Sequence, residues 1–133
     1  MSGARSRWLP CQPKSVAVAR GLLREVLAGT AIGDERLEVG ELVLSELVTN
    51  AVLHARVPGR LIQVQVTPVG DQLRIEVHDA SDERPAIRAA ADGDVSGRGL
   101  HLVASLAEAW GCCPRMGGGK FVWALVGPGE GDS

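Results

Sequence analysis

Apolar side chains recur at helical spacing in two stretches of the N-terminal half of the chain. From Pro13 to Ala28 they repeat every three or four positions, and Gly29 follows as a stop signal. A second stretch begins at Asp34, whose side chain suits an N-cap, and runs to about Ala55. The pattern therefore predicts two consecutive helices. The second is apolar around most of its circumference, so it should be buried.

The second half of the chain predicts strands. Leu73, Ile75 and Val77 alternate with polar residues, which is the pattern of a half-buried strand. Four segments are predicted to be strands: residues 61–66, 73–77, 111–116 and 120–126. A turn at 68–71 joins the first two, and three glycines at 117–119 join the last two.

One helix is predicted between the two strand pairs. Residues 82–97 lose the apolar period and predict a long loop, after which a helix is expected from about Leu100 to Ala109. This order predicts an α+β two-layer sandwich: a mixed, mostly antiparallel sheet covered on one face by three helices. The 133 residues suffice for one domain, with its core at about 13–126 and a flexible tail at 127–133.

Composition and charge exclude several classes of function. The net charge is −2 and the basic residues are scattered, so no surface for nucleic acid is expected. No apolar run is long enough to span a bilayer, and the N-terminus lacks the pattern of a signal peptide, so a cytoplasmic protein without a membrane partner is expected. The three cysteines, Cys11, Cys112 and Cys113, contain no C-x-x-C pair and are predicted to be small apolar side chains in a reducing compartment.

A polar stripe follows one face of the second predicted helix. Glu46, Asn50 and His54 are spaced four residues apart and share that face, while their neighbours are apolar. An ordinary solvated face is one explanation of such a stripe. However, a polar stripe on a helix that is buried on most sides must meet a partner. An amide oxygen and a carboxylate are also the groups that a magnesium–triphosphate site uses, as a hard ligand and as a base.

Two further polar features follow along the chain. Asp79 ends the second predicted strand, where it either caps a turn with Ser81 or points into a cleft and accepts a hydrogen bond from an exocyclic amine. The segment GRGL at 97–100 opens the third helix, whose free N–H groups suit a phosphate, although Gly-x-Gly pairs are also common in ordinary loops. A dinucleotide-binding fingerprint is excluded because Leu102 replaces its third glycine.

The order of these features resembles a known family. SELVTNAVLHA (45–55), VHDAS (77–81) and GRGL (97–100) resemble the N, G1 and G2 boxes of the Bergerat (GHKL) ATP-binding fold, which gyrase, heat-shock chaperone ATPases and histidine kinases share. The compact length and the closing GGGKFVWAL (117–125) look most like the stand-alone anti-sigma-factor serine/threonine kinases of bacteria. The resemblance covers about residues 13–126.

The resemblance implies a role for each box. Asn50 would ligate Mg2+, Glu46 would activate the attacking hydroxyl, and Asp79 would bind the adenine amine. His54 is expected to pack beneath a loop that closes over the phosphates, with the N–H groups near Gly99 and Leu100 contacting them. The implied ATP-binding residues are Asn50, Asp79, Ser81, Gly97, Arg98, Gly99 and Leu100.

One departure from the family lies in the last predicted strand. Phe121 stands where relatives commonly carry Thr, whose hydroxyl helps to hold a water in the adenine site. If the strand face that Phe121 shares with Trp123 and Leu125 looks into the cleft, the ring replaces that hydroxyl. On this hypothesis Phe121→Thr would tighten ATP binding.

Three functions are compatible with these residues. The leading hypothesis is a kinase that uses ATP and Mg2+ to phosphorylate Ser or Thr of an antagonist protein and that sequesters a sigma factor. The alternatives are a nucleotide-gated adaptor or anti-sigma binding module without phosphoryl transfer, and a slow ATPase. Glu46 favours the kinase, because an adaptor needs no base beside its metal ligand. The resemblance also allows a homodimer.

Overall fold

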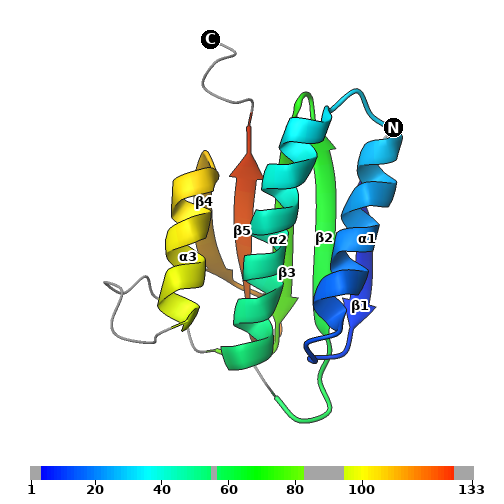
Figure 1. Cartoon of the computed structure of the whole chain (residues 1–133). Helices are drawn as coiled ribbons and strands as arrows, with labels where there is room; N and C mark the ends of the chain where they lie inside the picture. The colour runs from blue at the N-terminus through cyan, green and yellow to red at the C-terminus, as the bar shows by residue number, and fades with distance from the viewer. Residues whose placement is uncertain (1–3, 55–56, 83–94, 128–133) are drawn as a thin grey trace.

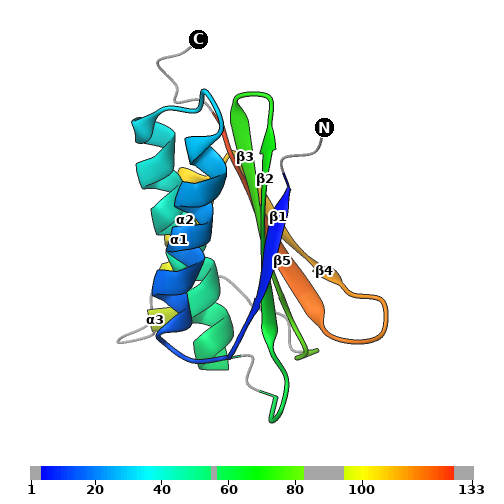
Figure 2. The same cartoon turned by 90° about the vertical axis from the view of Figure 1, so that its right-hand side faces the viewer.

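In the described part of the chain, five strands form one antiparallel sheet, and three helices cover one of its faces (Figures 1 and 2). The computed structural model describes residues 4–54, 57–82 and 95–127, and for residues 95–100 it describes the backbone alone. In chain order the elements are β1 (Arg5–Leu9), α1 (Ser15–Ala28), α2 (Asp34–His54), β2 (Ile62–Val69), β3 (Gln72–Asp79), α3 (Val95–Leu106), β4 (Ala109–Pro114) and β5 (Lys120–Val126). The strand order is β1-β2-β3-β5-β4. The predicted α+β sandwich is confirmed, and all four described strand pairings are antiparallel, so the sheet is not mixed.

The first strand was not predicted from the sequence. The segment RSRWL carries no alternation of apolar and polar residues, and only Leu9 of the strand is buried. Its backbone pairs with β2 from Arg5 opposite Val66 to Leu9 opposite Ile62. The ladder of main-chain hydrogen bonds therefore defines this edge strand, and side-chain periodicity gives no sign of it.

The other boundaries differ from the prediction by a few residues. The hairpin between β2 and β3 turns at Gly70 and Asp71 alone, because Val69 still pairs with Gln72. Gly70 has a φ of 63°, which suits the first central position of a two-residue hairpin. Helix α2 starts at Asp34, and Gly33 accepts the first helical bond from the Leu37 N–H. Asp34 therefore lies in the first turn, where its charge favours the positive end of the helix.

The core lies between the helices and the inner face of the sheet. Alternate residues of β2, β3 and β5 are buried there and meet apolar residues of α1 and α2. Gly40 brings α2 close to β3, since a Cβ at that position would lie 2.9 Å from Leu73 Cδ2. This close contact fixes the position of α2 relative to β3. No helix in the described ranges is long and apolar enough to cross a membrane.

The outer face of the sheet carries a separate polar and aromatic network on β3 and β5. The Glu76 carboxylate lies 2.7 Å from Arg74 Nε and 2.8 Å from His78 Nε2. His78 stacks on Phe121 with ring centroids 4.7 Å apart, and the Arg74 guanidinium lies 4.8 Å from the centre of a Trp123 ring. Burial raises the pKa of Glu76, but its bonds to Arg74 and His78 outweigh burial and hold the pKa below its usual 4.5.

This network predicts an acid-sensitive contribution to stability. A carboxyl whose pKa is lower in the folded state stabilises the fold above its unfolded pKa, and that stability is lost as the pH falls through the folded pKa. Between about pH 5 and about pH 3, the free energy of unfolding of the wild type should therefore fall more steeply than that of Glu76→Gln. Urea denaturation at several pH values measures both slopes. Equal slopes would show that Glu76 does not titrate differently in the folded and unfolded states.

Candidate functional site

Four segments that are distant in the sequence lie toward the same end of the sheet, which is the lower end in Figure 1. They are the C-terminal end of α2, the C-terminal end of β3, the start of α3 and the turn between β4 and β5. Helix α2 packs against both β3 and α3, and Asp79 of β3 pairs with Lys120 of β5. The polar residues predicted on α2 and β3 therefore lie near the same end of the fold.

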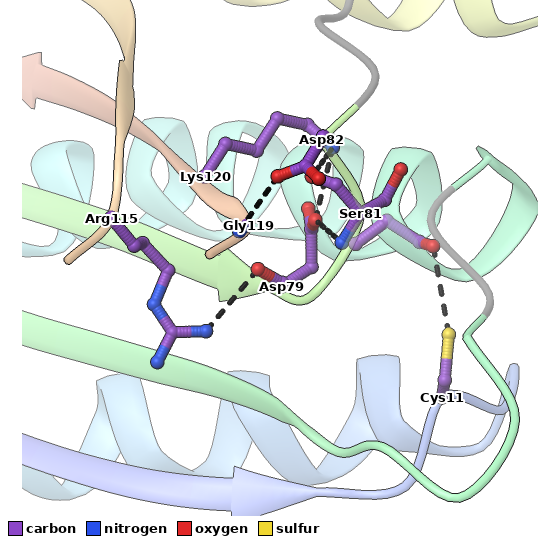
Figure 3. Close-up of polar contacts among 8 residues, drawn as sticks. Cys11, Asp79, Ser81, Asp82, Arg115, Gly119 and Lys120 are labelled. Carbon is purple, nitrogen blue, oxygen red and sulfur yellow. Dashed lines mark hydrogen bonds and ion pairs between the residues drawn. The ribbon is translucent and has the colours of Figure 1, made fainter. Parts of the chain in front are cut away.

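Asp79 is the last residue of β3 and faces the helices. It is in phase with the buried Leu73, Ile75 and Val77, and it is 2% exposed. Its Oδ1 accepts a hydrogen bond of 2.9 Å from the Ser81 N–H, so the predicted turn cap is present (Figure 3). This bond holds the chain as it leaves β3 and orients the carboxylate at the end of the strand.

Lys120 is the residue at this site that sequence reasoning missed. It is the first residue of β5 and is only 5% exposed, and its Nζ lies 3.0 Å from Asp79 Oδ1 and 3.3 Å from the Ser81 carbonyl oxygen. A signal was available, because Lys120 is in phase with the buried Val122 and Ala124. A charged residue in phase with core positions requires a buried partner.

The turn before β5 docks on the end of β3. The Gly119 N–H donates to Asp82 Oδ1 at 2.9 Å, and Arg115 Nη1 donates to the Asp79 carbonyl oxygen at 3.2 Å (Figure 3). Gly119 has a φ of 85°, and a Cβ there would lie 2.2 Å from that same carbonyl oxygen. Residue 119 must therefore be glycine for β5 to begin beside Asp79.

The polar stripe on α2 is buried in its middle. Asn50 is 9% exposed, Glu46 is half-buried and His54 is exposed. Within the described part of the chain, the Asn50 side-chain amide makes no hydrogen bond to another residue. Glu46 lies one turn before Asn50 on the same face, with about 5–6 Å between the Cβ atoms of such a pair. An amide of a largely buried residue that has no partner among the described residues is suited to bind a ligand.

The segment GRGL at 97–100 lies inside α3 and does not precede it. Helix α3 starts at Val95 and ends at Leu106, whereas the sequence predicted a helix from Leu100 to Ala109. In a helix from Val95, the N–H groups of Gly99 and Leu100 face the carbonyls of Val95 and Ser96. Both amides have intrahelical acceptors in an ideal helix that starts at Val95, and their contact with phosphates stays a prediction. The amides without an intrahelical acceptor are those of its first turn.

Helix α3 starts earlier than predicted because a helix tolerates the two glycines. Each glycine costs a helix about 1 kcal/mol relative to alanine, which does not prevent Gly97 and Gly99 from being helical. The side chains of Arg98 and Leu100, and residues 83–94 of the predicted loop, lie outside the described part of the structure. The predicted packing of His54 beneath that loop lies outside it for the same reason.

The hypothesis about Phe121 is wrong, because its side chain lies on the outer face of the sheet. Phe121 pairs with His78 and stacks on its ring, whereas the next ladder position pairs Asp79 with Lys120 on the inner face. Neighbouring residues of a strand point to opposite faces. Lys120, and not Phe121, is therefore the β5 residue that contacts the Asp79 carboxylate.

The cysteines show no sign of a metal site. None of the three forms a disulfide, and Cys11 Sγ lies 3.6 Å from the Ala51 carbonyl oxygen as a weak hydrogen-bond donor. Across residues 4–54, 57–82 and 95–127, no cluster of three or more His, Cys, Asp or Glu side chains could hold a metal ion.

Comparison with known proteins identifies the family. The model of the histidine kinase-like ATPase domain matches residues 9–124, and the chain belongs to this family. Among solved structures, the chain is similar to the histidine kinase domain of the blue-light activated histidine kinase of Erythrobacter litoralis EL346, with 21% identity and a TM-score of 0.48. The similarity covers 88% of this chain and 60% of that one, so the chain spans less than two thirds of its length. A comparison with curated proteins finds no significant match.

The docking of the turn on β3 yields a stability prediction with a matched control. Gly119→Ala should cost clearly more free energy of unfolding than Gly118→Ala, by about 1–3 kcal/mol. Both positions have positive φ, so both variants are strained, but a Cβ at Gly118 meets nothing within 4 Å. Urea denaturation of the two variants measures the difference. Equal losses would mean that β5 can move away from Asp79 at little cost.

Proposed function

We propose that the chain binds ATP with Mg2+ at this end of the sheet and transfers the γ-phosphate to Ser or Thr of a partner protein. The observation that carries the proposal is the side chain of Asn50, a residue only 9% exposed whose amide makes no hydrogen bond within the described residues, in a histidine kinase-like ATPase domain. The inward-facing carboxylate of Asp79, the last residue of β3, supports it.

The residues present fit Mg2+ and the nucleotide. Mg2+ prefers oxygen ligands and is usually held by one or two protein groups together with substrate phosphates, so a single amide oxygen from Asn50 is a suitable protein ligand. Bound Mg2+ would neutralise charge on the phosphate oxygens. The first turn of α3, from Val95, offers N–H groups and the positive end of a helix to the phosphates.

Glu46 is the proposed base for phosphoryl transfer. It lies one helical turn before Asn50, on the same face and half-buried, so it is close to the phosphates that Asn50 would help to hold. Its carboxylate takes the proton from the attacking Ser or Thr hydroxyl. The hydroxyl oxygen bonds to the γ-phosphorus and ADP leaves with the electrons of the broken bond.

The proposed partner is an antagonist protein that carries the phosphorylated Ser or Thr, and a sigma factor is the proposed target of regulation. Support comes from the resemblance of the boxes at 45–55, 77–81 and 97–100 to anti-sigma-factor kinases. The alternative is an adaptor that binds nucleotide and partner without transfer. Glu46 distinguishes the two, because the adaptor needs no base at this position.

The first prediction from this proposal concerns Asn50. The wild type should bind ATP more tightly with Mg2+ than without it, and Asn50→Ala should lose about tenfold in affinity in the presence of Mg2+, since a ligand to the cation is removed. Without Mg2+ the two proteins should bind alike. Thr49→Ala is the control, because Thr49 is the half-buried neighbour on another face of α2. Titration calorimetry measures all affinities, and a wild type that binds no ATP at millimolar concentration would refute the proposal.

The second prediction concerns Glu46. Glu46→Gln should bind ATP as the wild type does but transfer phosphate about a hundred- to ten-thousand-fold more slowly, because a general base contributes that much to the rate. The assay is transfer of labelled γ-phosphate to candidate antagonist proteins. Unchanged transfer by Glu46→Gln would place the base elsewhere, and the absence of transfer by the wild type to any candidate would favour the adaptor.

A further inference from the structure

The ammonium group of Lys120 has a hydrogen-bond donor to spare at a buried position. Its described partners are Asp79 Oδ1 at 3.0 Å and the Ser81 carbonyl oxygen at 3.3 Å. A lysine ammonium has three N–H donors, so one of them has no partner among the described residues. Lys120 is only 5% exposed, and buried donors normally find partners.

The Asp79 carboxylate has an acceptor to spare at the same place. Both hydrogen bonds that it receives from described residues end on Oδ1, one from Lys120 Nζ and one from the Ser81 N–H. Oδ2 receives none from the described part of the chain. The buried pair therefore presents a spare donor and a spare acceptor side by side.

The charge of the pair limits the kind of ligand that fits. Arg115 donates to the Asp79 carbonyl oxygen and not to the carboxylate, so among the described residues Lys120 alone balances the charge of Asp79. The Asp79–Lys120 pair is neutral overall. A charged ligand group would lose its hydration here without gaining a net opposite charge, which is costly. A neutral group with an adjacent donor and acceptor fits without that cost.

We propose that Lys120 is a specificity-determining residue that donates a hydrogen bond to ring atom N1 of adenine while the exocyclic amine binds Asp79 Oδ2. The amine and N1 of adenine are a neutral donor and acceptor that are both bonded to C6, on the Watson–Crick edge of the base. This inference rests on the proposed binding of ATP at this site. It replaces the role that the sequence hypothesis gave to residue 121, on the other face of β5.

The test compares ATP with 1-deaza-ATP, in which a C–H group replaces N1 and the amine is retained. The wild type should bind 1-deaza-ATP about tenfold more weakly than ATP, which corresponds to about 1.4 kcal/mol. In Lys120→Gln the two affinities should be nearly equal. The glutamine amide has two N–H donors, one for Asp79 and one for Ser81, and none for the base. Arg115→Met is the control, since it removes a cation that does not reach the carboxylate, and it should keep the tenfold difference.

Each result supports or overturns the inference. Equal affinities of the wild type for ATP and 1-deaza-ATP would overturn it while leaving ATP binding intact, whereas a wild type that binds neither would refute the proposed function itself. Tighter ATP binding by Lys120→Gln would overturn it too, because Lys120 would then compete with the base for Asp79. Thermal unfolding would reveal whether Lys120→Gln folds. If it does not fold, the ratio of the wild-type affinities for ATP and 1-deaza-ATP tests the hydrogen bond to N1.

Discussion

The buried ion pair between Asp79 and Lys120 is the interaction on which this end of the fold depends. It joins the last residue of β3 to the first residue of β5, and both side chains are almost fully buried. Removing one partner of such a pair leaves an uncompensated buried charge, which costs about 3–5 kcal/mol. Ser81 bonds to both members of the pair, and Gly119 packs against the Asp79 carbonyl oxygen, so the chain leaving β3 and the turn before β5 lie beside the pair.

The two faces of the sheet carry different polar groups: a side-chain network on the outer face and the candidate site on the inner face. On the outer face, Arg74, Glu76 and His78 satisfy one another, and their aromatic partners on β5 cover them, so this network needs no ligand. On the inner face, the close approach of α2 to β3 at Gly40 leaves the last turns of α2 beside the end of β3. There the Asn50 amide and the Lys120–Asp79 pair keep hydrogen-bonding capacity that described residues do not use. That unused capacity makes this end of the inner face suited to a ligand.

Sequence periodicity predicted the elements that bury an apolar face and missed β1, of which only Leu9 is buried. Helix α2, β3 and β5 carry strong patterns, and the predicted positions of Asn50 and Asp79 follow from them. Strand β1 was not predicted because its side chains are mostly exposed, and it is held in the sheet by its backbone pairing. The start of α3 was misplaced because two glycines resemble a loop in sequence, although a helix tolerates them at a modest cost.

The choice between Phe121 and Lys120 shows what a motif alone cannot decide. The two residues are adjacent, so a motif that is shifted by one position assigns the site to the wrong face of the strand. The alternation of side chains along β5 identifies the inward residue. Val122, Ala124 and Val126 are buried against the helices, and Lys120, two positions before Val122, lies on the same face. The same apolar pattern that identified β5 therefore also identifies which of its first two residues contacts Asp79. A polar residue in phase with a buried face is a stronger indication of a site than a departure from a familiar motif, because burial obliges it to have a partner.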